Sequence, residues 1–189
     1  MLLAARLLIP SLWVLWALLW MVLALRVKAV AWRESGLSRV VGVVPLLLAG
    51  WLFAAPHLPG WLGRRWAQPS WSLFGAGVAL VIAGLLLSVW ARFKLAGNWS
   101  GTVTLKEGHE IVRSGPYRWI RHPIYTGLLF ALLGSALALG EWRGLVAVVL
   151  AKGAFLWRIG LEERRLGEHF GASYAEYRRT SWAIVPYLF

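Results

Sequence analysis

Long apolar runs constrain the fold of this 189-residue sequence more than any other feature. A helix needs about 18 to 20 apolar residues to cross a hydrocarbon layer ~30 Å thick, and several runs approach or exceed that length. The hydrophobic content of 59% also lies above the roughly 45 to 50% of soluble domains. We therefore expect an all-α polytopic integral membrane protein with about five transmembrane helices, at residues 7–25, 40–57, 71–93, 125–139 and 143–160.

The fourth run, from Tyr125 to Leu139, is short for a span. At 1.5 Å per residue it reaches only ~22 Å, and the stretch "LGEWRG" then turns the chain sharply. Four spans are the alternative if the last two helices form a re-entrant hairpin, and a sixth span has no spare apolar run. A hairpin this short is expected to place its cytoplasmic end at the membrane interface, where a lipophilic substrate would enter laterally from the bilayer.

The basic residues predict the orientation. Fifteen Lys and Arg residues would flank one side of the membrane and four the other, namely Arg6, Arg64, Arg65 and Arg143. The positive-inside rule then places the amino terminus outside and a carboxyl-terminal helix in the cytoplasm, in a prokaryotic inner (plasma) membrane. Residues 94–124 and 161–189 share the cytoplasmic side, so they can meet. We expect one membrane domain, residues 1–189, with three spans in 1–93 and the catalytic half in 94–189.

Charge and cysteine content exclude several classes of site. The net charge of +12 lies in short loops between spans and not on a soluble basic module, so we expect no nucleic-acid partner. The absence of cysteine excludes disulfides, thiolate zinc sites and a cysteine nucleophile. No metal site is expected. The first run is too long for the core of a cleaved signal and lacks a small-residue cleavage site, so it is read as a retained span.

A polar stretch, "SGPYRWIRHPIYTG", precedes the fourth run. Gly115 and Pro116 indicate a turn, and Pro123 restricts His122 to an extended conformation just before a helix begins. Unpaired N–H groups gather at such a helix start and favour an anionic group, with the histidine beside it. The alternative is structural: the arginines at 118 and 121 hold lipid headgroups and the histidine caps the turn.

A second polar cluster, "WRIGLEERRLGEHFGASYAEYRR", follows the fifth run. Arg158 and Glu162 are four residues apart and share a helix face, whereas Glu163 is turned roughly 100° away. A charged side chain at the membrane edge costs free energy unless it pairs with another group or takes part in function. Glu162 is suited to a ribose or an amine, and Arg158 to a carboxylate. The alternative is an i,i+4 ion pair that ends the helix.

Other residues are ambiguous from sequence. Lys152 falls near the middle of the fifth run, where it must face a cavity, pair, or reach the interface. Phe170, Tyr174 and Tyr177 recur at helical spacing and predict one amphipathic helix over the membrane or the polar segment. The first run also carries a stripe expected to pack or face lipid, made of Trp13, Trp16 and Trp20.

The stretches "GPYRWIRHPIYTG" and "EERRLGEHFGASYAEYRR", separated by a two-helix hairpin and followed by Pro186, resemble the isoprenylcysteine carboxyl methyltransferase and phospholipid methyltransferase superfamily. The resemblance covers about residues 95–189. It depends on an Arg-His-Pro tripeptide, an acidic pair some 40 residues later, and a Phe-Gly-x-x-Tyr-x-x-Tyr pattern. The first three spans match only as generic membrane helices.

This resemblance implies methyl transfer from S-adenosylmethionine, which leaves S-adenosylhomocysteine, to a lipophilic small-molecule or lipid acceptor at the bilayer. The sequence agrees in lacking a GxGxxG signature. The implied catalytic residues are Arg158, facing the acceptor, and Glu162. The implied cofactor-binding residues are His109, Glu110, Ile111, Val112, Tyr117, His122, Pro123, Ile124, Tyr125 and Glu162.

The acceptor stays open at this stage. Sulfonium methyl transfer needs mainly an aligned acceptor, about 3 to 3.5 Å away, and little acid or base help. Arg158 favours a carboxylate, such as an isoprenylcysteine-like or other lipophilic acid. A phospholipid amine would instead prefer a neighbouring carboxylate. The other classes considered are an NAD(P)H-dependent membrane reductase of the sterol reductase type and a non-catalytic membrane scaffold.

Overall fold

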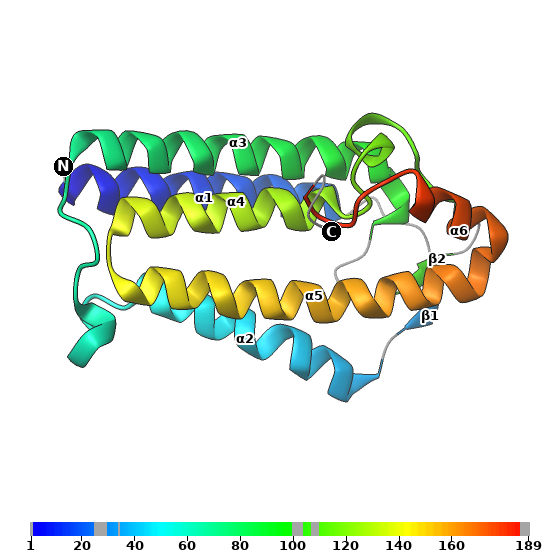
Figure 1. Ribbon diagram of the computed structural model, residues 1–189, viewed down its shortest axis with the longest axis horizontal. Helices are drawn as coiled ribbons and strands as arrows, with labels where there is room; N and C mark the ends of the chain where they lie inside the picture. The colour runs from blue at the N-terminus through cyan, green and yellow to red at the C-terminus, as the bar shows by residue number, and fades with distance from the viewer. Residues whose placement is uncertain (1, 25–29, 34, 100–103, 107–109, 186–189) are drawn as a thin grey trace.

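The fold is a bundle of long apolar helices whose axes lie side by side (Figure 1). It is seen in a computed structural model that describes residues 2–24, 30–33, 35–99, 104–106 and 110–185. Its helices are α1 (Leu2–Ala24), α2 (Gly36–Ala54), α3 (Trp71–Leu95), α4 (Pro123–Leu139), α5 (Trp142–Phe170) and α6 (Ala172–Arg179). Four of them, α1, α2, α3 and α5, are long and apolar enough to cross a membrane. The prediction of an all-α integral membrane protein is confirmed, with α4 as the expected short helix of 17 residues.

Short elements join the helices. A two-stranded antiparallel pair, β1 (Val30–Arg33) with β2 (Thr104–Lys106), lies near the α6 end of the bundle. Three single-turn 3-10 helices complete the described chain: η1 (Gly60–Gly63), η2 (Ala96–Asn98) and η3 (Gly115–Arg118). The apolar pattern did not predict the strands. The turn expected at Gly115 and Pro116 is present as η3, with φ of +61° at Gly115.

Glycines allow α3 and α4 to pack closely. A Cβ atom at any of these four positions would come within 3.0 Å of backbone atoms of the facing helix: Gly77, Gly84, Gly127 and Gly134. The glycines of each helix are seven residues apart, which is two turns and therefore one face. The pairs 77 with 134 and 84 with 127 show that the helices are antiparallel. This close pair fixes the position of the α4 amino terminus.

Two indole hydrogen bonds hold α1 against this pair. Trp13 Nε1 donates to Ser135 Oγ at 3.1 Å, and Trp16 Nε1 donates to Ser88 Oγ at 2.8 Å. The tryptophan stripe of α1 was expected either to pack against other helices or to face lipid. These hydrogen bonds show that it packs against α3 and α4. The apolar core beside it contains Ile9, Phe74, Val81, Leu85 and Ala131.

α5 packs against α2 and extends past the membrane-length run predicted for it. Ala49 and Leu52 of α2 form a core with Ala147, Ala151 and Phe155 of α5. α5 continues to Phe170, ten residues beyond the predicted end at residue 160, and this extension carries the acidic pair. Gly171, with φ of +54°, then ends the helix. Phe170 therefore does not share a helix with the α6 tyrosines, and the prediction of a single aromatic helix is wrong.

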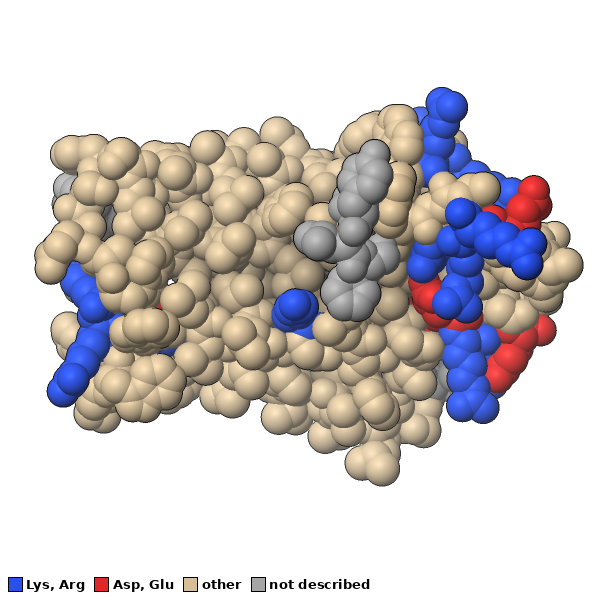
Figure 2. All heavy atoms as spheres, in the orientation of Figure 1, with Lys and Arg blue, Asp and Glu red and all other residues tan. Residues whose placement is uncertain are grey.

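Charged residues gather at the two ends of the bundle (Figure 2). The far end contains the α4–α5 turn, where Arg143 Nε lies 2.7 Å from Glu141 Oε2 and Arg65 donates to the Leu139 carbonyl at 3.1 Å. The opposite end, here called the polar end, contains the connector (residues 110–122), the last turns of α5, and the tail (residues 171–185). The predicted meeting of connector and tail occurs there.

Candidate functional site

The tail holds the connector in place through backbone hydrogen bonds. The amides of Arg121 and His122 donate to the carbonyls of Trp182 and Ala183 at 2.8 and 3.0 Å, and the Trp182 amide donates to the Trp119 carbonyl at 2.9 Å. These bonds form a short parallel bridge between segments some 60 residues apart. The chain entering α4 is therefore fixed before any ligand binds.

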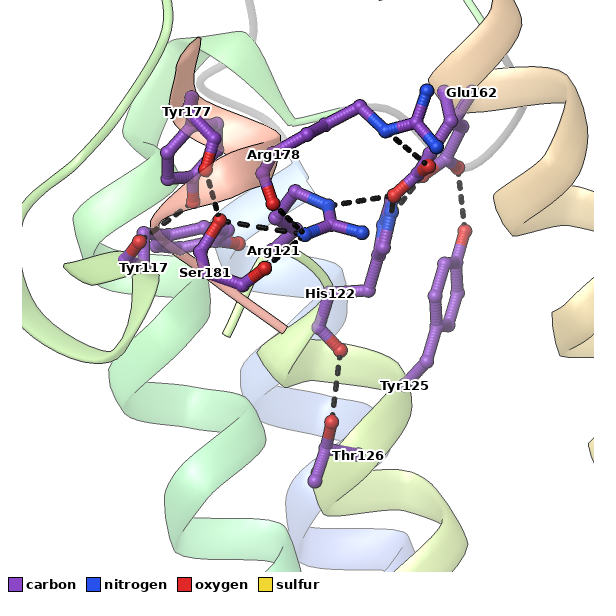
Figure 3. A network of polar contacts seen from close by, with 10 residues as sticks. Tyr117, Arg121, His122, Tyr125, Thr126, Glu162, Tyr177, Arg178 and Ser181 are labelled. Atoms are coloured by element: carbon purple, nitrogen blue, oxygen red, sulfur yellow. Dashed lines mark hydrogen bonds and ion pairs between the residues drawn. The ribbon is translucent and has the colours of Figure 1, made fainter. Parts of the chain in front are cut away.

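Side chains reinforce this junction. Tyr177 Oη of α6 donates to the Tyr117 carbonyl at 2.6 Å, and Thr126 Oγ1 in the first turn of α4 donates to the Ile184 carbonyl at 2.8 Å. Tyr177 and Thr126 are both buried. Figure 3 shows Tyr177 and Tyr117 to one side of the cluster described next, and Thr126 below His122.

His122 lies between the two carboxylates of the acidic pair (Figure 3). Its Nδ1 is 3.4 Å from Glu162 Oε2, and its Nε2 is 3.3 Å from Glu163 Oε1. His122 is the N-cap residue of α4, with φ of −123° and ψ of 56°, and Pro123 is the first helical residue. The expected non-helical conformation before Pro123 is present, although ψ falls short of a fully extended value. The start of α4 thus carries an imidazole directly to the carboxylates of α5.

The two carboxylates raise the pKa of this imidazole. Burial alone lowers the pKa of His122, but the hydrogen bonds and charges of Glu162 and Glu163 outweigh it, so the pKa is raised above 6.5. A protonated ring donates from both nitrogens, which matches one carboxylate at each. The cluster therefore favours the protonated form of His122, with one carboxylate near each ring nitrogen.

Tyr125 links Glu162 to Arg158. Its hydroxyl donates to Glu162 Oε1 at 2.6 Å and accepts from Arg158 Nε at 3.3 Å. Its ring stacks on Phe155 with centroids 5.0 Å apart and on His122 at 5.9 Å. The prediction that Arg158 and Glu162 share one face of α5 is consistent with this geometry, because both reach the same hydroxyl.

The two glutamates have different surroundings. Glu163 Oε1 accepts from Arg121 Nε at 2.7 Å, its Oε2 lies 3.2 Å from Arg178 Nε, and its side chain is 14% exposed. Glu162 accepts from Tyr125 and contacts His122, and its side chain is 25% exposed. Glu163 is thus the anchor that binds connector and tail, and Glu162 is the carboxylate that retains access to a ligand.

The structure brings only part of the predicted set together. Tyr117, His122, Pro123, Ile124 and Tyr125 line the junction of connector and α4, with Tyr117, His122 and Pro123 buried. Burial raises the pKa of Tyr117, and the charge of Glu162 adds to that shift.

The rest of the predicted cofactor set lies outside the cluster or outside the described residues. Glu110 is exposed and Ile111 and Val112 are half-buried, outside the hydrogen-bonded cluster of the described chain. His109 and Pro186 lie outside the described residues. Lys152 is exposed on α5, midway along a candidate span.

Sequence reasoning missed the roles of Arg121, Glu163 and Arg178. A 100° step between consecutive glutamates suggested separate faces, but a histidine with two ring nitrogens contacts both. The sequence feature that could have predicted this contact is the pair of adjacent carboxylates, Glu162 and Glu163, because two neighbouring glutamates near the end of a helix can bind opposite sides of one side chain.

Comparisons with known proteins agree with this architecture. Residues 77–168 match the model of the isoprenylcysteine carboxyl methyltransferase family. The protein-S-isoprenylcysteine O-methyltransferase of Saccharomyces cerevisiae is 32% identical over 115 residues, covering 59% of this chain and 48% of the relative. The Arabidopsis thaliana B enzyme is 28% identical over 121 residues, covering 62% and 61%. The chain therefore spans about half to three fifths of the length of these two relatives.

A solved structure shows the same fold. The eukaryotic intramembrane Ras methyltransferase, isoprenylcysteine carboxyl methyltransferase, superimposes with a TM-score of 0.54 at 22% identity, covering 80% of this chain and 51% of that one. The family match contains α4, the acidic pair and most of the glycine-packed α3. Over this region the chain is similar to the isoprenylcysteine carboxyl methyltransferase family, and the comparisons together support that superfamily of integral membrane proteins as its assignment.

Proposed function

We propose that this protein transfers a methyl group from S-adenosylmethionine to the carboxylate of a lipophilic acid, most closely an isoprenylcysteine-like acid. The observation that carries the proposal is the cluster in which Tyr125 joins Glu162, a partly exposed carboxylate, to Arg158, an arginine on the same helix. The carboxylate of Glu162 suits a cationic nucleoside, and the guanidinium of Arg158 suits an anionic acceptor. Both lie at the polar end of an apolar bundle, where a lipophilic substrate meets water.

The residues of the cluster fit the proposed cofactor. Glu162 has oxygen lone pairs beyond those used by Tyr125 and His122, and these suit the hydroxyls of a ribose or an ammonium group. The amides of Ile124 and Tyr125 belong to the first turn of α4, where N–H groups lack acceptors within the helix and favour a carboxylate. When bound, S-adenosylmethionine supplies an electrophilic methyl group on a sulfonium.

Arg158 is the residue that would hold the acceptor. It is buried, its Nε is directed to Tyr125, and a guanidinium binds a carboxylate through two parallel hydrogen bonds. A carboxylate is already ionised at neutral pH, so an oxygen attacks without a general base. Bound S-adenosylmethionine would supply its methyl group to this oxygen, and the bonding pair of the S–CH3 bond would remain on sulfur. The task of the protein is therefore alignment and exclusion of water.

The geometry supports a carboxylate acceptor over an amine. An ammonium headgroup must lose a proton before it attacks, and a carboxylate would have to accept it. Both candidate carboxylates already contact His122, whose protonated form they favour, and Glu163 also contacts Arg121. A base paired with cations is a weak proton acceptor. The guanidinium of Arg158 beside them would further disfavour a cationic acceptor.

We propose that the polar end faces the cytoplasm. The support is the distribution of arginines, because the polar end carries Arg113, Arg118, Arg164, Arg165 and Arg179 in addition to the cluster. The far end has four in the described residues: Arg6 of α1, Arg64, Arg65 and Arg143. Excess positive charge marks the cytoplasmic side of short loops.

Substitution of Glu162 tests the proposed cofactor site. We expect Glu162→Ala to abolish S-adenosylhomocysteine binding in detergent, as measured by isothermal titration calorimetry, because the exposed carboxylate is removed. Methyl transfer from labelled S-adenosylmethionine to a farnesylated thioether acid should be lost with it. The matched control is Glu168→Ala on the exposed face of α5, where Glu168 pairs with Arg164 and Arg165 of the same helix.

The control variant should bind S-adenosylhomocysteine with wild-type affinity. Unchanged affinity in Glu162→Ala would show that the cofactor pocket is assigned to the wrong residues. A wild-type protein that binds NADPH and not S-adenosylhomocysteine would replace the proposed reaction with a reduction.

A further inference from the structure

One face of α2 continues the contact with α5 into the polar end. The residues of α2 turned toward α5 recur at helical spacing and include Gly42, Ala49 and Leu52, all buried. Arg39 is three residues before Gly42 and half-buried, so it lies on this same face. At its polar end, the apolar face of α2 that packs on α5 therefore carries the guanidinium of Arg39. The whole of α2 lies outside residues 77–168, the region matched by the family model.

Gly42 is the residue of this α2 face that packs against the side chain of Arg158. A Cβ atom at Gly42 would lie 3.4 Å from Cγ and 3.6 Å from Cδ of Arg158, so the arginine stem lies on the glycine. α2 and α5 run antiparallel, because Leu52 and Ala49 pack with the early residues Ala147 and Ala151. Arg39 precedes Gly42 by three residues, which is about 4.5 Å along the α2 axis toward the polar end. Because Gly42 lies at the height of Arg158 on α5, Arg39 lies at about the height of residue 161, one residue before Glu162.

The Arg39 guanidinium is incompletely satisfied. Its Nε is buried and has no hydrogen-bond partner in the part of the chain that the structure describes. A buried donor without an acceptor is costly, and more so when it is charged. Figure 1 shows α2 diverging from α5 toward the amino-terminal end of α2. Arg39 lies in this amino-terminal part of the helix, three residues after Gly36.

The charges that α2 and α5 carry at this level favour an anion. Arg39 on α2 and Arg158 on α5 contribute two positive charges, and Glu162 contributes one negative charge that is already shared with His122 and Tyr125. An ammonium group placed between two guanidiniums would be repelled, whereas a carboxylate accepts from both.

We infer that Arg39 is a second binding residue for the acceptor carboxylate, opposite Arg158, and that it makes the enzyme selective for an anionic lipophilic acceptor. This inference rests on the proposed function and deepens it. Arg39 acts on acceptor binding and has no part in holding the cofactor, so the two can be separated by measurement.

The test compares an acid with its neutral ester. S-farnesyl-3-thiopropionic acid and its methyl ester are titrated into the full-length protein in detergent, with and without saturating S-adenosylhomocysteine. Wild type should bind the acid at least ~10-fold more tightly than the ester. Arg39→Met should remove most of this preference by weakening the acid alone, while Arg39→Lys retains part of it. Arg164→Met, at an exposed site, is the control and should behave as wild type.

The outcomes separate this inference from the proposed function. Retained acid preference in Arg39→Met, or no preference in wild type, overturns the role of Arg39. So does a loss of S-adenosylhomocysteine affinity in Arg39→Met, because it would assign the residue to the cofactor. If Arg39→Met does not fold, Arg39→Gln is measured in its place. Failure of wild type to bind S-adenosylhomocysteine refutes the proposed function, and the acid and ester titrations without it still decide the role of Arg39.

Discussion

The two ends of the bundle use the same residue types for different purposes. At the far end, Glu141 lies 2.7 Å from Arg143 and 3.8 Å from Arg65, and the buried Arg143 also donates to the carbonyls of Leu52 and Ala55. Every one of these contacts ends a helix or joins two helices. The far end is thus a closed structural cap.

The polar end is not closed in this way. Glu163 is paired with Arg121 and Arg178, but Glu162 contacts a histidine and a neutral phenol and keeps a quarter of its side chain exposed. An ion pair completed by arginines and carbonyls stabilises the fold. A carboxylate supported by Tyr125 and His122, with exposed surface left, is arranged to receive a ligand.

The largest expected effect is on stability at the far end. Arg143→Met should lower the free energy of unfolding by about 3 kcal/mol, because it leaves the carbonyls of α2 and the carboxylate of Glu141 without their donor. Thermal unfolding in detergent measures the change. Methyl transfer per folded molecule should stay within about twofold of wild type, and a selective loss of turnover would show that the far end contributes to the reaction.

The next effect is on turnover at the polar end. Arg158→Met should reduce kcat/KM by at least ~100-fold, because the acceptor carboxylate loses its guanidinium, while S-adenosylhomocysteine affinity stays within about twofold. Steady-state kinetics and calorimetry on the same preparation provide both values. A parallel loss of cofactor affinity would contradict the division of roles between Arg158 and Glu162.

A smaller difference between the ends should appear with pH. The raised pKa of His122 means that the folded protein keeps its proton to higher pH than the unfolded chain, whose histidine titrates near 6.5. Its contribution is complete below that value and is lost as pH rises through the folded pKa, by at most about 1.4 kcal/mol per pH unit.

Thermal midpoints measured from pH 6 to pH 9 check this expectation. Wild type should lose stability across the range, and His122→Gln should have a flatter profile. Parallel profiles for the two proteins would show that His122 is not protonated in the folded state.

Periodicity and hydropathy were sufficient to predict the helices and the meeting of connector and tail. Run length identifies a membrane helix, and the arginine distribution places residues 94–124 and 161–189 on one side. Spacing also placed Arg158 and Glu162 on one face, as their shared contact with Tyr125 indicates.

What failed depended on contacts between distant segments. The role of Glu163 requires the ring orientation of His122, which the backbone bonds to Trp182 and Ala183 fix from the tail. The break at Gly171 was hidden because the aromatic spacing continues across it. The position of Arg39 depends on the antiparallel packing of α2 and α5, which no local pattern in the sequence specifies.

The most direct test of the account is an experimental structure of the protein with S-adenosylhomocysteine bound. The account predicts the nucleoside between the first turn of α4 and the end of α5, with Glu162 in contact with it and the sulfur facing Arg158. A ligand bound away from Glu162 and the α4 amino terminus would contradict the central claim.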